Sequence, residues 1–287
     1  MTTMASTVGA PSARMIKWTS INWRTIQNFV YRLQTRIAKA IKLGRYGKAK
    51  ALQWLLTHSF YAKLLAVRRV TQNKGKNTPG VDGVVWKTPK QKMQAVFSLK
   101  RRDYKSSPLR RIYIPKKNGK LRPLGIPTKT DLAQQALHLL ALEPISETLA
   151  DKNSYGFRPK RSLHDAIEQC FNALARKNSP QWILEGDIKA CFDKISHEWL
   201  QKHIIMDKGI LKQWLKAGYM EKDIFHDTTE GFPQGGAASP CLANQALDGL
   251  EETILSVGKR KDKLNFVRYA DDCAPRTLTS LLVKDAA

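Results

Sequence analysis

The sequence has few of the patterns that mark secreted or membrane proteins. Its four cysteines, Cys170, Cys191, Cys241 and Cys273, include no CxxC pair and no histidine cluster with zinc spacing. No apolar run approaches the roughly 20 residues that cross a bilayer, and the first residues lack the apolar core of a secretory signal. We therefore expect a cytoplasmic protein without a membrane partner. Its thiols should be reduced and mostly buried, and residues 1–17 should form a disordered lead-in.

Acidic residues are scarce in the first part of the chain. The whole chain has 49 Lys and Arg against 24 Asp and Glu, a net charge of +25. Residues 1–110 carry 23 of the basic residues but only Asp82 and Asp103 as acids. A segment with that imbalance repels itself unless a polyanion neutralises it, and Lys and Arg bind phosphates without reading sequence.

Aromatic residues are interleaved with these basic residues, which favours a nucleic-acid surface over a solvated charged helix face. An acidic membrane surface is the weaker alternative because no lipidation signal accompanies the charge. The pattern predicts that this region binds nucleic acid, and RNA above all. The aromatic residues are Trp18, Trp23, Phe29, Tyr31, Trp54, Phe60 and Tyr61.

Two stretches of the basic region have helical periodicity, and we expect them to form a basic helical domain over residues 18–104. The first helix should begin near Trp23, behind the capping residues Ser20 and Asn22, and end near Gly44. The second should run over residues 48–69. The first apolar stripe contains Ile26, Phe29, Val30, Leu33, Ile37 and Ile41, and the second contains Leu52, Leu55, Leu56, Phe60, Leu64 and Leu65.

The rest of the chain mixes strand and helix patterns, which is typical of an α+β fold. Residues 110–115 and 121–126, joined by a turn at 117–120, predict a β-hairpin. Other elements are expected as buried helices at 131–142 and 163–175, helices at 197–215 and 240–254, and strands at 182–187 and 264–269.

Two of the expected strands end in carboxylates. Asp187 closes one apolar run, and Asp271 and Asp272 follow the other. Adjacent aspartates alone are usually a solvated turn, but carboxylates at the ends of neighbouring central strands can share divalent cations. Mg²⁺ prefers hard oxygen ligands and is usually held by one or two carboxylates plus substrate phosphates. Two such ions can activate an attacking 3′-hydroxyl and stabilise a pyrophosphate leaving group.

Six motifs, in order, resemble those of group II intron reverse transcriptases, and the resemblance covers roughly residues 18–272. The YADD segment at 269–272 is similar to the family signature. Residues 187–192 resemble the partner motif of the palm, and residues 231–244 resemble the motif that lies between these two in the family. The intron subgroup is indicated by the segments TPGVDG at 78–83, RPLGIP at 122–127 and NSYGFRP at 153–159.

The resemblance implies an α+β fold with the fingers and palm of a right-hand polymerase at residues 105–272. It implies an RNA-directed DNA polymerase with two Mg²⁺ ions, which Mn²⁺ can replace, acting on an RNA template, a DNA primer and dNTPs. Group II intron RNA is a further implied partner, with links to splicing and intron mobility. Protein partners are not indicated.

The resemblance also implies roles for single residues. Asp187 and Asp271 would ligate both metal ions, with Asp272 assisting and the backbone carbonyl of Ile188 completing the shell. Phe192 would lie against the sugar 2′ position and exclude ribonucleotides by volume. Ordinary core packing is the alternative for that ring.

The fingers turn and the motif that follows the palm strand would bind the nucleotide. Lys116 and Arg122 flank the turn where the family holds the incoming triphosphate, and generic RNA contact is their alternative role. Gln234 would contact the nucleotide or the template. Gly235 and Gly236 would let backbone approach closely.

After Asp272 the sequence departs from the family pattern. The family continues with an apolar strand that returns from the catalytic turn, whereas residues 273–279 read CAPRTLT, and Pro275 is a poor central-strand residue. We also find no sequence for the rest of the palm, a thumb or a maturase domain. We therefore expect a non-family tail at 273–287, a catalytic hairpin unpaired on one side, and weak or absent polymerase activity from this truncated copy.

Two other functions remain open. The basic region alone would suit a non-catalytic, maturase-type fragment that binds intron RNA. A retron-type reverse transcriptase would share the palm motifs, but the basic N-terminal helices and residues 78–83 argue against it.

Overall fold

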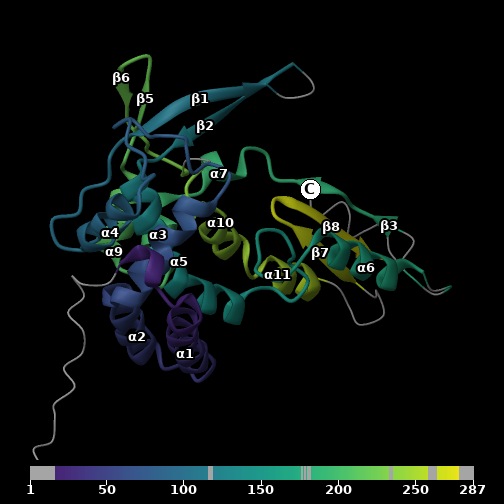
Figure 1. Cartoon of the computed structure of the whole chain (residues 1–287). Coiled ribbons are helices and arrows are strands. Elements are labelled where there is room, and N and C mark those ends of the chain that lie inside the picture. Colours follow the sequence, from purple (N-terminus) through teal and green to yellow (C-terminus); the bar gives the residue numbers. More distant parts are fainter. Residues whose placement is uncertain are drawn as a thin grey trace, which may run out of the picture.

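The computed structural model describes residues 17–115, 119–175, 177, 179, 182–232, 235–257 and 264–277. It consists of a helical base, from which one sheet projects on one side and a second sheet lies at the far end (Figure 1). The predicted lead-in, apart from Lys17, and residues 278–287 of the predicted tail lie outside the described residues.

The first predicted helix is confirmed as α1 (Trp23–Lys42). The side chain of Asn22 caps it by accepting a hydrogen bond from the N–H of Thr25 at 3.2 Å. Phe29 is 39% exposed and lies off the buried stripe. The other five residues of the predicted stripe are buried: Ile26, Val30, Leu33, Ile37 and Ile41.

The single helix predicted over residues 48–69 is wrong. The chain forms α2 (Tyr46–His58) and α3 (Phe60–Gln72), separated by Ser59 in an extended conformation. Packing explains the break at Ser59. Helix α3 contacts α1, α4 (Pro89–Ser98) and α5 (Lys129–Leu149), so it buries residues on more than one face. The buried residues of α3 are Ala62, Leu64, Ala66, Val67 and Val70.

Helix α5 is the central element of the base. It was predicted at residues 131–142 but extends further at both ends, and Thr128 caps it by accepting the N–H of Asp131 at 3.1 Å. It contacts α1, α2 and α3 on one side and α10 (Ser239–Leu247) on the other. Helix α5 is buried on several sides, and its apolar residues contribute to both large hydrophobic clusters.

The first sheet has the strand order β2-β1-β5-β6. The predicted hairpin is confirmed as β1 (Leu109–Pro115) and β2 (Leu121–Ile126), in an antiparallel register. A second hairpin, β5 (Tyr219–Glu221) and β6 (Ile224–His226), was not predicted. Its first strand, β5, pairs in parallel with β1. Its turn residues Lys222 and Asp223 have positive φ angles without being glycine, so the sequence carried no turn signal there.

The second sheet contains β3 (Trp182–Ile183), β4 (Gly186–Asp187), β7 (Asn265–Tyr269) and β8 (Asp272–Thr277). The expectation of a hairpin without its returning strand is wrong, which removes one of the reasons for expecting weak or absent polymerase activity. Strand β8 returns from the turn, pairs with β7 along its length, and pairs with β3 and β4 on its other side.

Pro275 is accommodated in β8 by a gap in the pairing. Strands β3 and β4 pair with β8 in one continuous register. The gap in the pairing falls between them, where Leu184 would face Pro275. Since a two-residue hairpin loop closes with a hydrogen-bonded pair, the odd-numbered residues of β8 direct their backbone groups toward β3 and β4. The missing N–H of Pro275 therefore faces the place where β3 ends and β4 has not begun.

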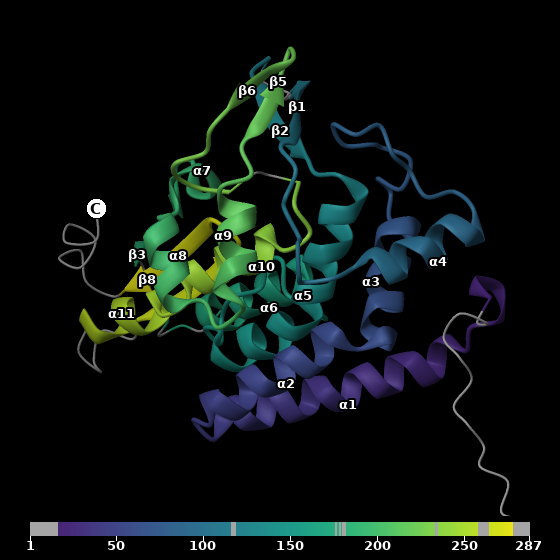
Figure 2. The same cartoon turned by 90° about the vertical axis from the view of Figure 1, so that its left-hand side faces the viewer.

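The remaining helices pack on the second sheet and around α5, whereas the first sheet projects clear of them (Figure 2). None of the helices within the described ranges is long and apolar enough to span a membrane. All four cysteines are free thiols, and two of them, Cys191 and Cys241, are buried. The helices are α6 (Leu163–Leu174), α7 (Cys191–Lys194), α8 (His197–His203), α9 (Lys208–Leu215) and α11 (Leu250–Val257).

The expectation that the helix at 163–175 is buried is wrong. In α6 only Ala166 is buried, where the helix packs on Val267 of β7. Leu163, Ile167 and Phe171 are all more than half exposed, because no described element covers the outer face of this helix.

From the burial of His138 we predict how the free energy of unfolding depends on pH. The ring is buried in α5, edge-on to Trp214 at 5.6 Å, and burial lowers its pKa to about 4. The folded protein therefore holds the neutral ring, whereas the unfolded chain protonates it near pH 6.5. This contribution to stability is complete above pH 6.5 and is lost as pH falls toward 4, by up to about 3 kcal/mol.

Urea unfolding of wild-type protein and His138→Phe between pH 7.5 and 4 measures this contribution. We expect the substitution to flatten the acid limb of the unfolding free energy. His164→Gln, on the exposed surface of α6, should leave that limb unchanged. Parallel pH curves for wild type and His138→Phe would contradict the assignment.

Candidate active site

Three carboxylates meet at one end of the second sheet. Asp187 ends β4, Asp272 begins β8, and Asp271 lies in the two-residue turn between β7 and β8. Asp187 is the cross-strand partner of Asp272, and the backbone N–H of Ile188 donates to the carbonyl of Asp271 at 3.3 Å. The convergence of Asp187 with the YADD turn is therefore present in the backbone pairing itself.

The hydrogen bond from Ile188 also fixes the kind of pair that Asp187 and Asp272 form. In an antiparallel ladder this bond is the one that flanks a non-hydrogen-bonded pair, in which the two side chains lie on one face and approach most closely. Their Cβ atoms are then about 4.5–5.5 Å apart. Burial, followed by the nearby charges of Asp271 and Asp187, raises the pKa of Asp272 above its usual range.

The donor chemistry of this tip suits a divalent cation. Asp187 and Asp272 are exposed, Asp271 is half-buried, and all three offer hard carboxylate oxygens. The carbonyl of Ile188 accepts the N–H of Cys191 at 3.2 Å, which leaves its second lone pair available. Among the described residues, no three His, Cys, Asp or Glu side chains are grouped closely enough to hold a metal ion by themselves. A cation here would need further ligands from a substrate.

A buried arginine anchors the hairpin that carries this tip. Arg268 of β7 is fully buried, and its guanidinium donates to Asp248 at 2.8 Å, to Asn244 at 3.1 Å and to the carbonyl of Ala270 in the turn at 3.3 Å. Asp151 lies 4.0 Å from the same guanidinium. Burial raises the pKa of Asp248 to about 6 and outweighs the attraction of Arg268.

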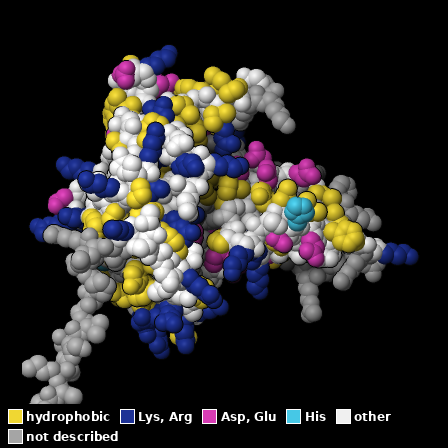
Figure 3. Space-filling model, in the orientation of Figure 1, with side chains coloured by type: hydrophobic (Ala, Val, Ile, Leu, Met, Phe, Trp, Pro, Cys, Tyr) yellow, Lys and Arg dark blue, Asp and Glu magenta, His cyan; other side chains and the backbone are white. Residues whose placement is uncertain are grey.

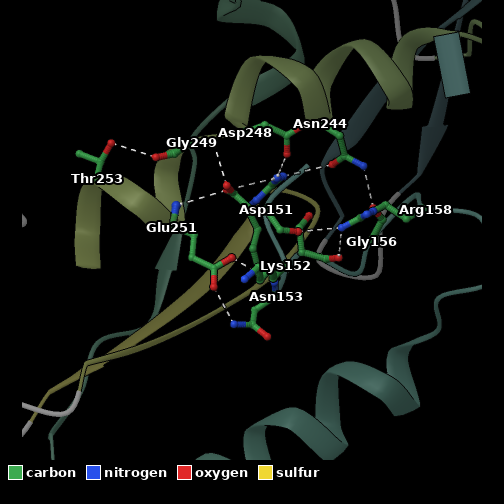
Figure 4. A network of polar contacts seen from close by, with 12 residues as sticks. Asp151, Lys152, Asn153, Gly156, Arg158, Asn244, Asp248, Gly249, Glu251 and Thr253 are labelled. Carbon is green, nitrogen blue, oxygen red and sulfur yellow. Dashed lines mark hydrogen bonds and ion pairs between the residues drawn. The ribbon is translucent and has the colours of Figure 1, made fainter. Parts of the chain in front are cut away.

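The loop at residues 151–158 lies beside this anchor, and Figure 4 shows Asp151, Asn153 and Gly156 of the loop near Asn244 and Asp248. On the backbone, Arg268 donates to the carbonyl of Asn153 and accepts from Tyr155, both at 2.9 Å. Asn244 donates to the carbonyl of Gly156 at 2.9 Å. The loop therefore forms an extra partner along the free edge of β7.

Two further contacts hold the loop at residues 151–158 to helices α5 and α11. The guanidinium of Arg158 is bidentate to Glu147 of α5, at 2.9 and 2.8 Å. Glu251 of α11 accepts from the backbone and the side chain of Asn153, at 3.0 and 2.6 Å. Three segments that the sequence offered only as separate motifs are thus joined around one arginine.

Gly156 permits the closest contact in this assembly. A Cβ at this position would clash with the backbone N and the side chain of Ala270. Ala270 itself has φ of 61°, the left-handed conformation that a tight hairpin turn requires. The loop therefore presses directly against the turn that positions Asp271.

Phe192 lies in an aromatic cluster close to the tip. Its ring is buried and makes edge contacts with Phe157 at 6.1 Å and Phe232 at 5.6 Å. Its carbonyl accepts the N–H of Phe232 at 2.9 Å. The ring contributes to the hydrophobic core beside the site, so its predicted contact with a sugar stays a prediction.

The predicted nucleotide-binding residues are only partly described. Lys116 and Gln234 lie outside the described residues. Arg122 is exposed on β2, opposite Ile114 of β1. Gly235, with φ of 127°, lies against the carbonyl of Gly125, where a Cβ would clash. The close backbone approach that was predicted at Gly235 is therefore an approach to β2 of this same chain.

Sequence reasoning missed the anchor. Arg268 lies within an apolar strand, next to Tyr269 of the YADD signature. A charged residue in the middle of a buried strand was the available signal, because such a group requires a buried partner. Asp248 and Asp151 are those partners.

Comparison with known proteins gives two family matches and several relatives. The N-terminal domain of reverse transcriptase matches residues 18–99, and reverse transcriptase (RNA-dependent DNA polymerase) matches residues 114–275. The second match runs past Asp272 into β8, beyond the boundary predicted for the family segment.

Two relatives show how much of a longer protein this chain spans. Protein YkfC of Escherichia coli (strain K12) is 42% identical over 69% of this chain and 56% of its own length. The group II intron-encoded protein LtrA of Lactococcus lactis is 39% identical over 74% of this chain and 36% of its own length. The chain thus spans about half or less of these relatives. A telomerase structure from Candida albicans aligns with 16% identity and a TM-score of 0.49, over 63% of this chain and 40% of that one.

The anchor predicts a large cost for removing Arg268. Arg268→Met leaves Asp248 and Asp151 buried without their cation, and we expect the free energy of unfolding to fall by about 3–5 kcal/mol. Arg69→Met is the matched control, because Arg69 pairs with Glu143 at 3.1 Å on the surface and should lose less than about 1 kcal/mol. Urea unfolding at pH 7.5 compares the two variants. Equal losses would contradict the role assigned to Arg268.

Proposed function

The chain belongs to the reverse transcriptase family of RNA-dependent DNA polymerases, and on that premise we propose that it performs template-directed nucleotidyl transfer in a group II intron system. The observation that carries this proposal is the convergence of Asp187, Asp271 and Asp272 at the tip of one sheet. The identity with an intron-encoded relative supports the choice of system.

The family generally uses divalent metal ions, and we assign them to this tip as two Mg²⁺ ions that Mn²⁺ can replace. Asp187 and Asp271 would hold both ions, Asp272 would assist, and the carbonyl of Ile188 would complete the shell. When bound, the ions supply charge stabilisation for the attacking 3′-oxygen and for the leaving pyrophosphate. This role agrees with the raised pKa of Asp272, because a cation relieves the repulsion among the carboxylates.

The other residues of the proposed site would bind and orient the nucleotide. Arg122 on β2 suits the triphosphate, together with Lys116 in the fingers turn. Phe192 would limit the space beside the sugar, and Gln234 would contact the nucleotide or the template. Gly235 would serve this site indirectly, because its contact with Gly125 holds the loop against the fingers.

A second function is favoured by the charge of the N-terminal part. The 23 basic residues within residues 1–110 suit binding of intron RNA, which would assist splicing whether or not DNA is made. The two functions are compatible, because α1 and α2 lie apart from the β7–β8 hairpin (Figure 1). In the same orientation, Lys and Arg side chains gather over the helical base (Figure 3).

Primer extension on an RNA template with a DNA primer, dNTPs and Mg²⁺ tests the catalytic proposal. Asp187→Asn and Asp271→Asn should each lower product formation at least about 100-fold, because each removes a ligand to the ions that stabilise developing charge. Glu198→Gln is the control, since Glu198 is an exposed carboxylate of α8 outside the tip. Robust extension by either aspartate variant would refute the metal assignment.

The same aspartate variants separate the two functions. Equilibrium binding to an intron RNA fragment should be unchanged in Asp187→Asn, because the substitution removes a negative charge far from the basic helices. If binding and extension were lost together, the tip and not the basic region would be the main RNA contact.

A further inference from the structure

A groove lies on the helical base, away from the carboxylate tip. It consists of two adjoining hollows of about 200 and 190 Å³, which share Thr57, His58, Arg101 and His138 in their walls. Helix α2 lines both hollows, and in both views α2 lies far from the β7–β8 hairpin (Figures 1 and 2). We call this surface the α2 groove.

Positive charge gathers around the α2 groove. Among the described residues that line it, Asp207 is the one acidic side chain, and Arg101 already pairs with it at 2.7 and 3.4 Å. Burial, and then the nearby charge of Lys100, lower the pKa of Lys63, so like charges are crowded here. A bound polyanion relieves such crowding. The remaining cations in the walls are Lys50, Lys63, Lys100 and Arg102.

An aromatic platform stands at the edge of the same groove. Trp54 is 60% exposed, although an indole of this size is usually buried in a core. His58 stacks on one face of the indole, with ring centroids 4.2 Å apart and planes 23° apart. The ring of His58 is itself tied by Nδ1 to the carbonyl of Trp54 at 2.8 Å. The indole is thus braced on one side while much of its surface faces solvent.

We propose that the α2 groove binds a single-stranded segment of RNA, with one base stacked on Trp54 and the adjoining phosphates held by Lys100 and Arg102. The choice of RNA rests on the proposed function, whereas the choice of a single strand rests on the groove. A base in a duplex is covered by its neighbours, so only an unpaired base can stack on a protein ring. Exposed aromatic rings beside cations are the arrangement that binds such strands.

Fluorescence anisotropy with a labelled unpaired RNA of about 12 nucleotides tests this inference on the whole chain, with the length chosen to exceed one stacking site. Trp54→Ala should weaken binding about 10-fold or more, whereas Trp54→Phe should retain most of the affinity. Phe171→Ala is the matched control, because Phe171 is 66% exposed on α6 and does not line the groove. It should bind as wild type does.

The phosphate contacts have a separate readout in salt dependence. For a single strand, each phosphate contact adds about 0.7 to the slope of log affinity against log salt, so Lys100→Ala/Arg102→Ala should reduce the slope by about 1.4. An RNA duplex of the same length should not respond to Trp54→Ala. Circular dichroism and the thermal midpoint establish that each variant is folded.

The inference is overturned if Trp54→Ala binds the single strand as tightly as wild type, or if Phe171→Ala loses as much affinity. It is also overturned if the duplex responds to Trp54→Ala as strongly as the single strand. The binding assay contains no primer, nucleotide or divalent ion, so its result does not depend on polymerisation. Wild-type protein that binds through Trp54 but fails in primer extension would refute the catalytic proposal alone.

Discussion

The ion pairs and hydrogen bonds of one buried arginine hold together the end of the molecule that carries the YADD turn. Arg268 contributes both its guanidinium and its backbone, so a single residue connects the YADD turn, the loop at 151–158 and helix α10. Burying a charge costs several kcal/mol unless its partners compensate. Asp248 and Asp151 provide that compensation, and the position of Asp271 depends on them although neither touches it.

Strand pairing is the second constraint on the site. Asp187 and Asp272 are far apart in the chain, and only the register between β4 and β8 brings them onto one face. A slip of one residue would turn one of the two carboxylates to the opposite face of the sheet. Pro275 interrupts the ladder on the side of β3 and β4 only, because its missing N–H faces the gap between these two strands.

The local sequence pattern was sufficient to predict the elements whose residues interact mainly with neighbours close in the sequence. The stripe of α1, the cap at Asn22 and the β1–β2 hairpin follow from periodicity and turn chemistry, and the motifs identified the family. Features that depend on distant packing could not be predicted in this way. The break at Ser59, the exposed face of α6 and the pairing of β5 with β1 are set by what each element meets in three dimensions.

The pairing of β8 with β4 has a consequence for the order in which the protein is made. A chain emerges from the ribosome N-terminus first, and its early segments can fold as units while later ones are still being added. Helices α1 to α5 bury one another without any strand of the second sheet. The helical base can therefore be complete on the nascent chain before β8 is synthesised and the carboxylates first come together.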